Sequence, residues 1–401
     1  MSFKKIEASP FRAKIEVPSS KSFANRALVL AALKKEAVTL ENIPLSSDVE
    51  LMIDCLKKIG LEITQSPNRI CVVNSFPECE KETQVVLETG EGGTTNRFLI
   101  PLLSLGSSEY IIEPKGHMRK RPMKPLYETL IQHGVFVESE KDHWLKIKGP
   151  FQVEESTIEV DCTQTTQFAT GLALALSKLG LDVIPRGLST SESYWKMTLD
   201  LIEKVKASNH LLIPVDFSSL GYPIAMALHC GEVTITNCHE IDEFQADSVL
   251  IEIVKKMGGT ISFSKEGLII SKSQLNGLEI DCSDCPDLVA TLAFLCSYAK
   301  GESLLKNIEV LKYKECDRIL ETMRILDAFG ITHELNSSNG MSLKIQGRKS
   351  HHQYVPFTPE DDHRMVMVSY LFMRANGGGE LGRIEAVEKS FSNFFDVMEN
   401  H

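Results

Sequence analysis

The sequence predicts an α/β protein assembled from about six similar subdomains. An amphipathic helical pattern that ends in glycine and is followed by alternating apolar residues recurs along the chain, which is typical of a helix that leads into a strand. The 401 residues exceed a typical domain of roughly 100–200 residues, so we expect about two or three domains. With 43% hydrophobic and 24% charged residues, the chain has enough apolar material for packed cores.

The recurring helices indicate where the subdomains lie. Four helices are expected to end near a glycine, at Gly60, Gly134, Gly258 and Gly330. A fifth helix, without the glycine, is expected over residues 194–207. These ends lie roughly 50 to 75 residues apart, longer than a solenoid repeat of about 20–50 residues, so each subdomain should contain more than one helix and several strands. Strands are expected in β-rich runs at residues 145–149, 232–238 and 267–271, and the extended run 207–219 is the candidate crossing between domains.

The charge balance restricts the possible partners. The chain has 43 Lys and Arg against 54 Asp and Glu, a formal net charge of -11. A protein that follows a nucleic-acid backbone makes many basic contacts to phosphates, so we expect no nucleic-acid partner. A cationic pocket for small anions is still compatible with an acidic protein, because net charge does not describe local fields.

The ten cysteines lack the dense spacing of a secreted disulfide scaffold, so we expect free thiols in a reducing compartment. The first twenty residues contain no apolar signal-peptide core, and no stretch reaches the roughly 18 to 20 apolar residues of a spanning helix. We therefore expect a cytoplasmic protein without membrane association. Cys282 and Cys285 form a CxxC pair, but a structural zinc site normally needs four well-spaced ligands, so we expect no metal.

Four segments combine basic residues with a turn or a helix start, where backbone N–H groups favour anions. The first, PSSKSFANRALVLAAL, places Lys21, Ser22 and Arg26 in the opening turns of an apolar helix. A helix start with a solvated basic face is the alternative interpretation of this segment.

The second segment, GEGGTTNRFL at residues 90–99, offers backbone that a ligand can approach closely and leads into a helix over FLIPLLSLG. It is neither a P-loop nor a dinucleotide fingerprint, because no GK[ST] follows and the glycine spacing differs. Arg119, Lys120 and Arg121 follow shortly afterwards, which favours an anion site over an ordinary turn.

The third and fourth segments are LKYKECDRI and DDHRMVM. In the third, Lys314 and Arg318 are expected to share a helical face at i,i+4, although a structural charge network explains the pattern equally well. In the fourth, Asp361 or Asp362 is expected to cap a helix and Arg364 to project from its first turn.

Together these segments resemble the enolpyruvyl transferase family. KSFANRALVLAAL is similar to that family's lysine-serine opening motif, GGTTNRFL to its glycine-threonine-arginine loop and RPMKPL to its Arg-Pro signature. KECDRI and DDHRMVM are similar to two later motifs of the family. The motifs occur in the family's order at compatible separations and cover essentially the whole chain, so together they are far more specific than any one of them.

The resemblance implies a fold and a reaction. The fold has two domains, each made of three βαβαββ subdomains in an inside-out α/β barrel, with one discontinuous domain over residues 1–15 and 216–401 and a second over 16–215. The sites are expected between the domains, which close over substrate. The reaction transfers the carboxyvinyl group of phosphoenolpyruvate to the 5-hydroxyl of shikimate 3-phosphate through a tetrahedral intermediate, in aromatic amino-acid biosynthesis. The resemblance implies no cofactor, and we expect a monomer.

The resemblance also implies residue roles. Both substrates are strongly anionic, so several cations are needed to bring them together out of water. The residues implied to hold phosphoenolpyruvate are Lys21, Gly93, Arg121, Gln167, Arg318, Arg364 and Lys389. Those implied to hold shikimate 3-phosphate are Lys21, Ser22, Arg26, Thr165, Thr166, Gln167, Ser191, Asp287 and Lys314. The implied catalytic residues are Asp287, which would take the proton of the 5-hydroxyl, Glu315, which would act at the methylene carbon, and Lys21.

Several positions differ from the family pattern, Glu91, Asn96 and Val310 among them. Glu91 stands where an asparagine is usual, Asn96 replaces an apolar residue, and Val310 lies where many members have a polar side chain. A carboxylate that faces another anion is repulsive unless it turns away or pairs with an arginine such as Arg97 or Arg121.

Two alternative functions follow from these differences. One is an enolpyruvyl transferase for another acceptor, such as UDP-N-acetylglucosamine, and the other is a related protein that binds a phosphorylated ligand without turnover. Ser22 follows Lys21, and PKGHMRKRPM contains no cysteine, and both features favour shikimate 3-phosphate over UDP-N-acetylglucosamine.

Overall fold

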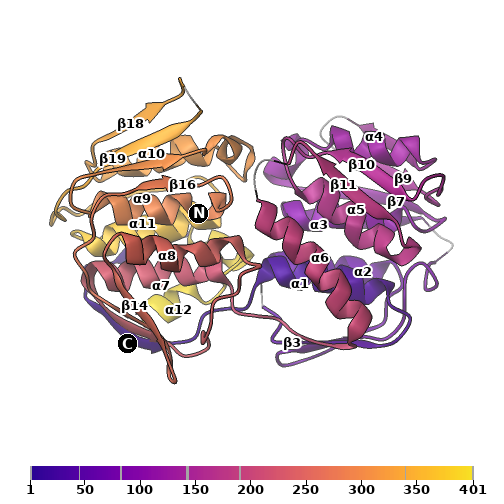
Figure 1. The fold of residues 1–401 in the computed structure, drawn as a ribbon, viewed down its shortest axis with the longest axis horizontal. Coiled ribbons are helices and arrows are strands. Elements are labelled where there is room, and N and C mark those ends of the chain that lie inside the picture. Colours follow the sequence, from indigo (N-terminus) through magenta and orange to yellow (C-terminus); the bar gives the residue numbers. More distant parts are fainter. Residues whose placement is uncertain are drawn as a thin grey trace. The chain divides into compact units, whose positions relative to one another are not determined.

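The chain folds into two compact units. The computed structural model describes residues 2–44, 46–81, 84–140, 144–188, 191–338 and 340–399. Unit 1 consists of Met1–Pro18 and Val215–His401, and unit 2 of Ser19–Pro214 (Figure 1). The sequence placed these junctions at 15/16 and 215/216, and the second junction lies within the extended run 207–219.

Unit 2 contains three sheets in the part that the structure describes. Its elements are α1 (Lys21–Leu33), β3 (Val38–Glu41), α2 (Ser47–Lys58), β4 (Ile63–Ser66), β5 (Arg69–Val72), β6 (Val85–Gly90), α3 (Gly93–Leu103), β7 (Glu109–Pro114), η1 (Gly116–Lys120), α4 (Lys124–Gln132), β8 (Phe136–Glu140), β9 (Trp144–Lys148), β10 (Thr157–Asp161), α5 (Gln167–Leu176), η2 (Ser177–Leu179), β11 (Asp182–Arg186), α6 (Glu192–Ala207) and β12 (His210–Leu212). The strand orders are β12-β3-β5-β4, β6-β7-β9-β8 and β10-β11.

Unit 1 likewise contains three sheets among its described residues. Its elements are β1 (Phe3–Ile6), β2 (Phe11–Ile15), α7 (Phe217–Cys230), β13 (Gly231–Ile235), η3 (Ala246–Val249), α8 (Leu250–Lys256), β14 (Thr260–Ser264), β15 (Gly267–Ser271), β16 (Glu279–Asp281), η4 (Pro286–Leu288), α9 (Val289–Ser297), β17 (Glu302–Lys306), η5 (Glu309–Tyr313), α10 (Arg318–Ala328), β18 (His333–Asn336), β19 (Ser342–Gln346), α11 (His363–Ala375), β20 (Gly379–Gly382), η6 (Ile384–Lys389) and α12 (Phe394–Glu399). The strand orders are β14-β15-β13-β2, β16-β17-β19-β18 and β1-β20.

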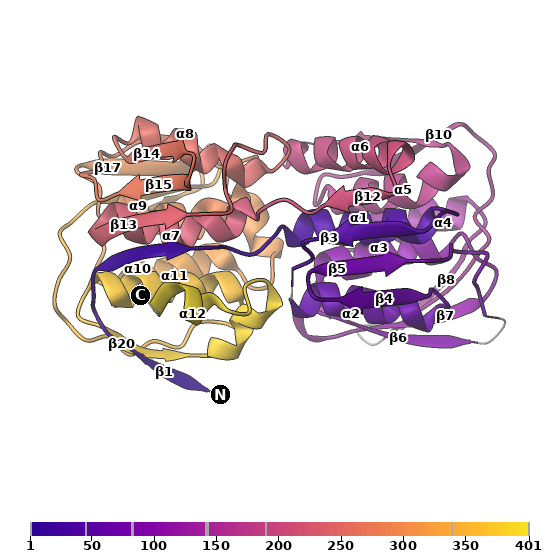
Figure 2. The ribbon, with the colours of Figure 1, turned by 90° about the horizontal axis from the view of Figure 1, so that it is seen from below.

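The four-stranded sheets share the expected βαβαββ pattern. In the sheet β6-β7-β9-β8 the chain runs β6, α3, β7, α4, β8 and β9, with β6 parallel to β7 and an antiparallel hairpin after α4. The sheet from β16 to β19 repeats this path. In the other two, the first strand comes from a distant part of the chain, because β12 lies parallel to β3 and β2 lies parallel to β13. Figure 2 shows strands of these sheets on the outside, over the helices of their own unit.

The glycines that were expected to end helices do so in the left-handed conformation. Gly60, Gly134, Gly258 and Gly330 have φ angles of +113°, +77°, +92° and +64° and follow α2, α4, α8 and α10. A strand follows each of them, at β4, β8, β14 and β18. Glycine adopts this conformation without a Cβ penalty, so the helix-glycine-strand pattern in the sequence is confirmed.

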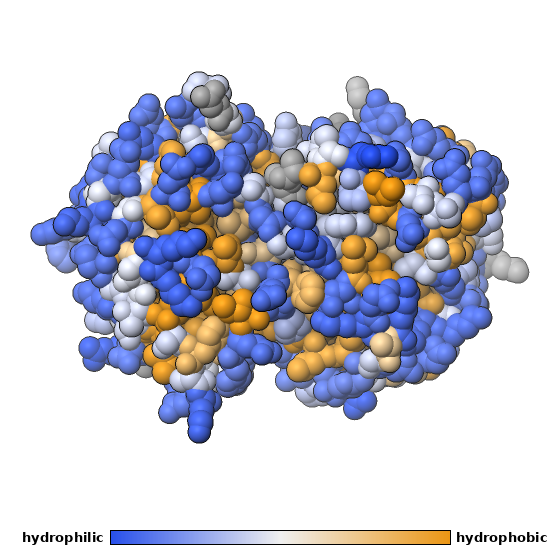
Figure 3. Space-filling view, viewed as in Figure 1, coloured by the Kyte–Doolittle hydropathy of each residue, from blue (hydrophilic) through white to orange (hydrophobic). Residues whose placement is uncertain are grey.

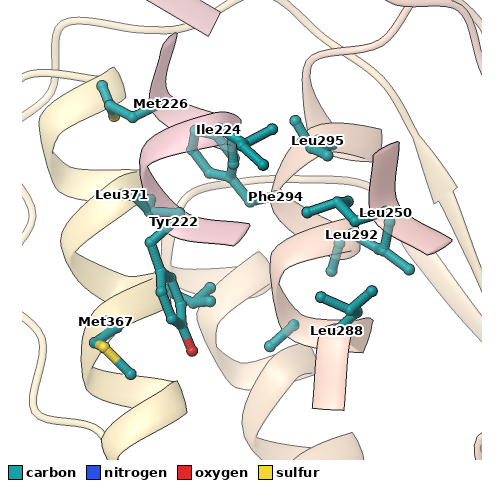
Figure 4. Close-up of a cluster of buried hydrophobic side chains, with 14 of the residues drawn as sticks. Tyr222, Ile224, Met226, Leu250, Leu288, Leu292, Phe294, Leu295, Met367 and Leu371 are labelled. Carbon is teal, nitrogen blue, oxygen red and sulfur yellow. The ribbon is translucent and has the colours of Figure 1, made fainter. Parts of the chain in front are cut away.

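Each unit has its own apolar core, built on helices that are buried on nearly every side. In unit 1, all residues of α9 and all of α11 except Ala375 are buried. Figure 4 shows side chains of this core, with Met226 and Leu295 at one end of the cluster and Met367 and Leu288 at the other. The helices α7 and α9 therefore pass through the core of unit 1 from one end to the other.

Hydrophilic side chains are prominent on the face drawn in Figure 3, with several groups of apolar side chains between them. Apolar side chains on the surface are normal for a folded domain. Within the described ranges no helix has the length and apolar character needed to cross a membrane.

The helices α3 and α5 approach each other closely because Gly171, in α5, has no side chain. A Cβ atom built on Gly171 would overlap the backbone carbonyl of Arg97 and would lie 3.3 Å from Cγ of Pro101. Gly221, inside α7, is different, because its Cβ would meet side-chain carbon atoms at 3.5 Å or more, which is ordinary contact. Only the first of these two helical glycines is required by packing.

We predict that Gly171→Ala and Gly221→Ala change stability in opposite directions. Gly171→Ala should lower the free energy of unfolding of unit 2 by about 1–3 kcal/mol, because α3 and α5 must separate. Gly221→Ala should leave unit 1 unchanged or stabilise it by up to about 1 kcal/mol, because alanine is the better helix former. In urea unfolding, the fluorescence of Trp144 and Trp195 follows unit 2, and far-UV circular dichroism follows both units. Equal stability of the two variants would contradict the close contact.

Candidate active site

Several of the basic residues singled out in the sequence gather in one cluster within each unit. The Arg318 cluster of unit 1 contains Asp287, Lys314, Glu315, Arg318, Asp362 and Arg364. The Lys21 cluster of unit 2 contains Lys21, Asp48, Gly93, Arg97, Arg121 and Gln167. Members of each cluster come from helix starts and turns that are distant along the chain.

Arg318 is the first residue of α10, and the cap residue before it sets its position. Asp317 accepts hydrogen bonds from two backbone N–H groups of the first turn, at 3.1 and 3.2 Å. Lys314 lies before this cap, in extended backbone that follows η5. The prediction that Lys314 and Arg318 share a helical face is therefore wrong, because the cap starts the helix too late to include Lys314. Both side chains nevertheless reach Asp287.

Arg318 binds three carboxylates at once. Its Nε lies 2.6 Å from Asp362 Oδ2, its Nη1 2.7 Å from Asp287 Oδ1 and its Nη2 2.8 Å from Glu315 Oε2. The side chain is only 3% exposed. Burial alone would lower the pKa of the guanidinium, but the three carboxylates hold it well above its usual value. A planar guanidinium with five N–H donors is the side chain suited to such a junction.

Asp287, in η4, is the point at which the cations of unit 1 converge. Lys314 Nζ lies 3.2 Å from Asp287 Oδ1, and Arg364 Nη2 lies 3.2 Å from Asp287 Oδ2. Burial favours the protonated acid, but Arg364, Lys314 and Arg318 together hold the pKa of Asp287 well below its usual value. The group is therefore a carboxylate at neutral pH.

One acidic residue at the start of α11 both caps the helix and forms an ion pair. Asp362, rather than Asp361, is the cap, because its Oδ1 accepts a hydrogen bond of 2.9 Å from the backbone N–H of Arg364. The same carboxylate pairs with Arg318, so capping and ion pairing share one residue. Lys389 ends η6, which packs against α11, and its ammonium nitrogen is buried.

In unit 2, Lys21 begins α1 and pairs with a residue that the sequence did not single out. Ser20 caps the helix by accepting a hydrogen bond of 3.3 Å from the backbone N–H of Phe23. Lys21 Nζ lies 3.0 Å from Asp48 Oδ2, and the two side chains are 15% and 10% exposed. Asp48 lies in the first turn of α2, where acidic residues are common, so the sequence contained no signal for this contact.

Gly93 is surrounded by polar groups of its own unit. A Cβ atom on Gly93 would lie 2.8 Å from Nη1 of Arg121 and 3.0 Å from Oε1 of Gln167. Gln167 Oε1 also accepts a hydrogen bond of 2.8 Å from Arg97 Nη1. The helix α3 begins at Gly93, earlier than the expected segment from Phe98, so the glycine backbone forms its first turn. Arg121, Gln167 and Arg97 therefore meet at one helix N-terminus.

Arg26 is almost fully buried between two helices of unit 2. Its side chain lies in α1 with 2% exposure, and burial lowers its pKa to about 10. Its Nε donates to Thr198 Oγ1 at 2.9 Å, its Nη1 to the carbonyl of Ser22 at 2.8 Å and its Nη2 to the carbonyl of Tyr194 at 3.5 Å. Arg26 thus joins α1 to α6.

The remaining predicted residues lie at or beside helix starts. Ser22 is the second residue of α1, and Thr166 is the cap residue of α5. Thr165 Oγ1 accepts a hydrogen bond of 3.3 Å from the first backbone N–H of α5. Ser191 precedes α6 with a left-handed φ of +59°. Val310, one of the departures from the family pattern, lies in η5.

The other two departures are accommodated by local contacts. The Glu91 carboxylate lies against Gly116, at a position that a Cβ atom would fill. Asn96 is buried and donates hydrogen bonds to the carbonyls of Gly92 and Thr89, at 2.9 and 3.3 Å, while its Oδ1 accepts one of 2.6 Å from Thr89 Oγ1. Asn96 therefore fastens the loop before α3 to that helix, which an apolar residue at this position would not do.

Asp247 is a buried acid that sequence reasoning missed. It is 1% exposed in η3, its Oδ2 accepts a hydrogen bond from Ser218, and among the described residues its Oδ1 has no hydrogen-bond partner. Burial, and secondly the charge of Asp287, raise its pKa to about 7, while Arg364 opposes the shift. In the sequence it resembled an ordinary acid at a helix start, because burial has no local signal.

Neither metal ligation nor a disulfide is seen among the described residues. No group of three or more His, Cys, Asp or Glu side chains there is arranged to hold a metal ion. All ten cysteines are free thiols. A hydrogen bond with Cys282, together with burial, raises the pKa of Cys285, so the thiol of this CxxC pair stays protonated.

The fold is similar to solved structures of enolpyruvyl transferases. An EPSP synthase from Acinetobacter baumannii matches with a TM-score of 0.77, covering 99% of this chain and 97% of that one, at 19% sequence identity. The enolpyruvyl transferase NikO from Streptomyces tendae matches with a TM-score of 0.74, covering 99% and 96%, at 12% identity. At these identities the likeness shows the fold, which is that of the enolpyruvyl transferases.

Sequence comparison defines the family more closely. The chain matches the family EPSP synthase (3-phosphoshikimate 1-carboxyvinyltransferase) over residues 6–209 and 203–398. A protein named 3-phosphoshikimate 1-carboxyvinyltransferase from Pyrococcus abyssi is 30% identical, with coverage of 96% of this chain and 93% of the relative. One of the same name from Syntrophobacter fumaroxidans is 28% identical, with coverage of 98% and 97%. This chain belongs to the EPSP synthase family.

The raised pKa of Asp247 predicts a loss of stability as pH rises. The folded-state pKa of about 7 exceeds the value of about 3.9 for an unfolded Asp, so between these values the folded protein holds the extra proton. The free energy of unfolding therefore falls as pH rises through this window, by at most about 1.4 kcal/mol per pH unit. Asp247→Asn removes this titration. The free energy of unfolding of this variant, relative to that of the wild type, should therefore rise by about 2 kcal/mol from about pH 5.5 to pH 8, as measured by urea unfolding. A pH-independent difference would contradict the buried neutral acid.

Proposed function

We propose that this protein transfers the enolpyruvyl group of phosphoenolpyruvate to the 5-hydroxyl of shikimate 3-phosphate and releases phosphate. The match to the EPSP synthase family extends over nearly the whole chain and supports this reaction. The observation that carries the proposal is the convergence of Lys314, Arg318 and Arg364 on the carboxylate of Asp287. The three cations keep this carboxylate ionised, so it can accept a proton once an anionic substrate draws the cations away from it.

The two substrates are anions, and both clusters supply cations for them. We assign phosphoenolpyruvate to Lys21, Gly93, Arg121, Gln167, Arg318, Arg364 and Lys389, and shikimate 3-phosphate to Lys21, Ser22, Arg26, Thr165, Thr166, Gln167, Ser191, Asp287 and Lys314. The Lys21 cluster contains three cations and one carboxylate, and this excess of positive charge favours binding of a phosphate or carboxylate group. Arg26 can contribute because a guanidinium has donors beyond those that hold α6.

The Arg318 cluster, in contrast, is internally neutralised. Its three cations face the three carboxylates of Asp287, Glu315 and Asp362. A substrate anion that binds Arg364 or Lys314 therefore competes with Asp287 for these cations. As Asp287 loses cationic partners, its pKa rises toward the range in which it accepts a proton efficiently. Substrate binding thus activates the base.

The proton transfers follow from this arrangement. Asp287 takes the proton of the 5-hydroxyl while the oxygen forms a bond to the central carbon of phosphoenolpyruvate, and Glu315, in its protonated form, gives its proton to the methylene carbon. The tetrahedral adduct then loses phosphate, which leaves with the proton held by Asp287, and the new methyl group returns a proton to Glu315 as the double bond re-forms. Lys21 stabilises the charge on the reacting anions. General acid–base groups of this kind contribute typically about 10²- to 10⁴-fold each.

Other acceptors are less well supported. The relatives from Pyrococcus abyssi and Syntrophobacter fumaroxidans carry the name of the shikimate 3-phosphate enzyme. Two of the departures that suggested these alternatives are also accommodated, because the Glu91 carboxylate lies against Gly116 and Asn96 joins the loop before α3 to that helix. Neither observation requires a different substrate.

Phosphate release measured with different acceptors tests the proposed function. The full-length protein with phosphoenolpyruvate should release phosphate when shikimate 3-phosphate is present, and not with UDP-N-acetylglucosamine or without an acceptor. Asp287→Asn and Glu315→Gln should each lower kcat by about 10²- to 10⁴-fold, because each removes one proton-transfer group.

The control variant is Asp327→Asn, which changes an exposed acid of α10 and should retain wild-type turnover. Release with UDP-N-acetylglucosamine alone would support the other acceptor, and binding of shikimate 3-phosphate without release would support a non-catalytic protein. Turnover near the wild-type value in both Asp287→Asn and Glu315→Gln would refute the assigned catalytic roles.

A further inference from the structure

Unit 1 contains a cavity at some distance from the Arg318 cluster. It has a volume of about 730 Å³ and lies where α7 and α9 end. Its walls come from these helix ends and from the segments that follow β15 and β19. Asp287 lies just before the first residue of α9, and a helix of nine residues is roughly 13 Å long, so the cavity is at the opposite end of this helix.

The walls of this cavity are positively charged in an acidic protein. They include Lys272, Lys300, Arg348 and Lys349, and the described residues that line the cavity include no carboxylate. In the described part of the chain, none of the three lysines has an ion pair with a carboxylate. Arg348 is held in place, because its Nη1 donates to the carbonyl of Gly330 at 2.6 Å. An anion in the cavity would therefore meet cations that no protein group neutralises.

One wall of the cavity is aromatic. The rings of His229 and Tyr298 have centroids 4.4 Å apart, and Phe294 packs against both, at 5.7 and 5.2 Å. Burial, with a smaller effect of Lys272, lowers the pKa of His229 to about 4, so the imidazole is neutral at physiological pH. The rings of His229 and Tyr298 are inclined by 50° to each other, and their partly exposed parts present uncharged aromatic surface beside the lysines.

An aromatic wall beside several cations without carboxylate partners is complementary to an anion that carries an aromatic ring. Aromatic rings stack on other rings, whereas lysine ammonium groups bind phosphate, sulfonate or carboxylate oxygens. A volume of about 730 Å³ is within the range of roughly 300–1,000 Å³ for small-molecule sites. Phosphoenolpyruvate and shikimate 3-phosphate contain no aromatic ring, so neither has the chemistry of this cavity.

We propose that this cavity is a second binding site, for a small organic anion with a planar aromatic ring. The ring lies on His229 and Tyr298, and the anionic group lies among Lys272, Lys300 and Lys349. The proposal is independent of the reaction assigned to the Arg318 cluster.

A fluorescence titration of the full-length protein with 8-anilinonaphthalene-1-sulfonate, a sulfonate that carries a planar naphthalene ring, tests the site. With the wild type, the fluorescence should rise to saturation as the sulfonate binds. In Lys272→Glu/Lys300→Glu the affinity should fall by about tenfold or more, because two attractive charges become repulsive. Lys349→Glu alone should weaken it in the same direction.

The matched control is Lys256→Glu/Lys265→Glu, which makes the same charge change at two exposed lysines of unit 1 outside the cavity. Its binding should stay within about twofold of the wild type, because these charges are not in contact with the ligand. N-phenyl-1-naphthylamine, which has the same rings without the sulfonate, should bind the wild type and Lys272→Glu/Lys300→Glu alike. Equal binding of the sulfonate by the cavity variant and the control variant would overturn the proposal.

Discussion

The buried guanidinium of Arg318 is the constraint on which the rest of its cluster depends. It contacts Asp287, Glu315 and Asp362, and the last of these also caps α11. Removing one partner of a buried ion pair leaves an uncompensated charge, which costs about 3–5 kcal/mol. The contacts that keep Arg318 stable in the interior are therefore the same contacts that hold the starts of α10 and α11 together and place the acidic groups. Stability and proton chemistry depend on one set of atoms.

This network separates two neighbouring acids by their environments. Asp287 is surrounded by three cations and remains a carboxylate. Asp247 is paired with a serine hydroxyl, and its pKa of about 7 means that it keeps its proton at lower pH. Titratable groups whose pKa values are pushed in opposite directions are typical of acid–base sites. Because the cations that keep Asp287 ionised are also those assigned to the substrates, its proton affinity depends on whether substrate is bound. In the proposed mechanism, Asp287 is therefore least reactive as a base before substrate binds.

Local patterns in the sequence predicted the recurring helices and the strands after them, because helix ends and caps depend on neighbouring residues, whereas the two-domain topology was implied by the family resemblance. The glycine that ends each helix and the strand after it could be recognised in this way. The helical pairing of Lys314 with Arg318 failed because Asp317 competes as a cap, and spacing alone does not show which residue starts a helix. Asp48 and Asp247 were missed because their roles depend on burial and on contacts between distant segments. The cationic clusters were found only because several motifs resembled those of one family.

The ionisation state of Asp287 is the central claim, and it can be measured directly. Carbon-13 NMR of the full-length protein, labelled at the aspartate carboxyl carbon, reports each titration, with Asp287→Asn and Asp247→Asn to assign the two resonances. In the protein without substrates, Asp287 should stay ionised from about pH 5 to about pH 9, while Asp247 should titrate near pH 7. An Asp287 resonance that titrates within this range would show that the three cations do not hold the carboxylate, and would contradict the account.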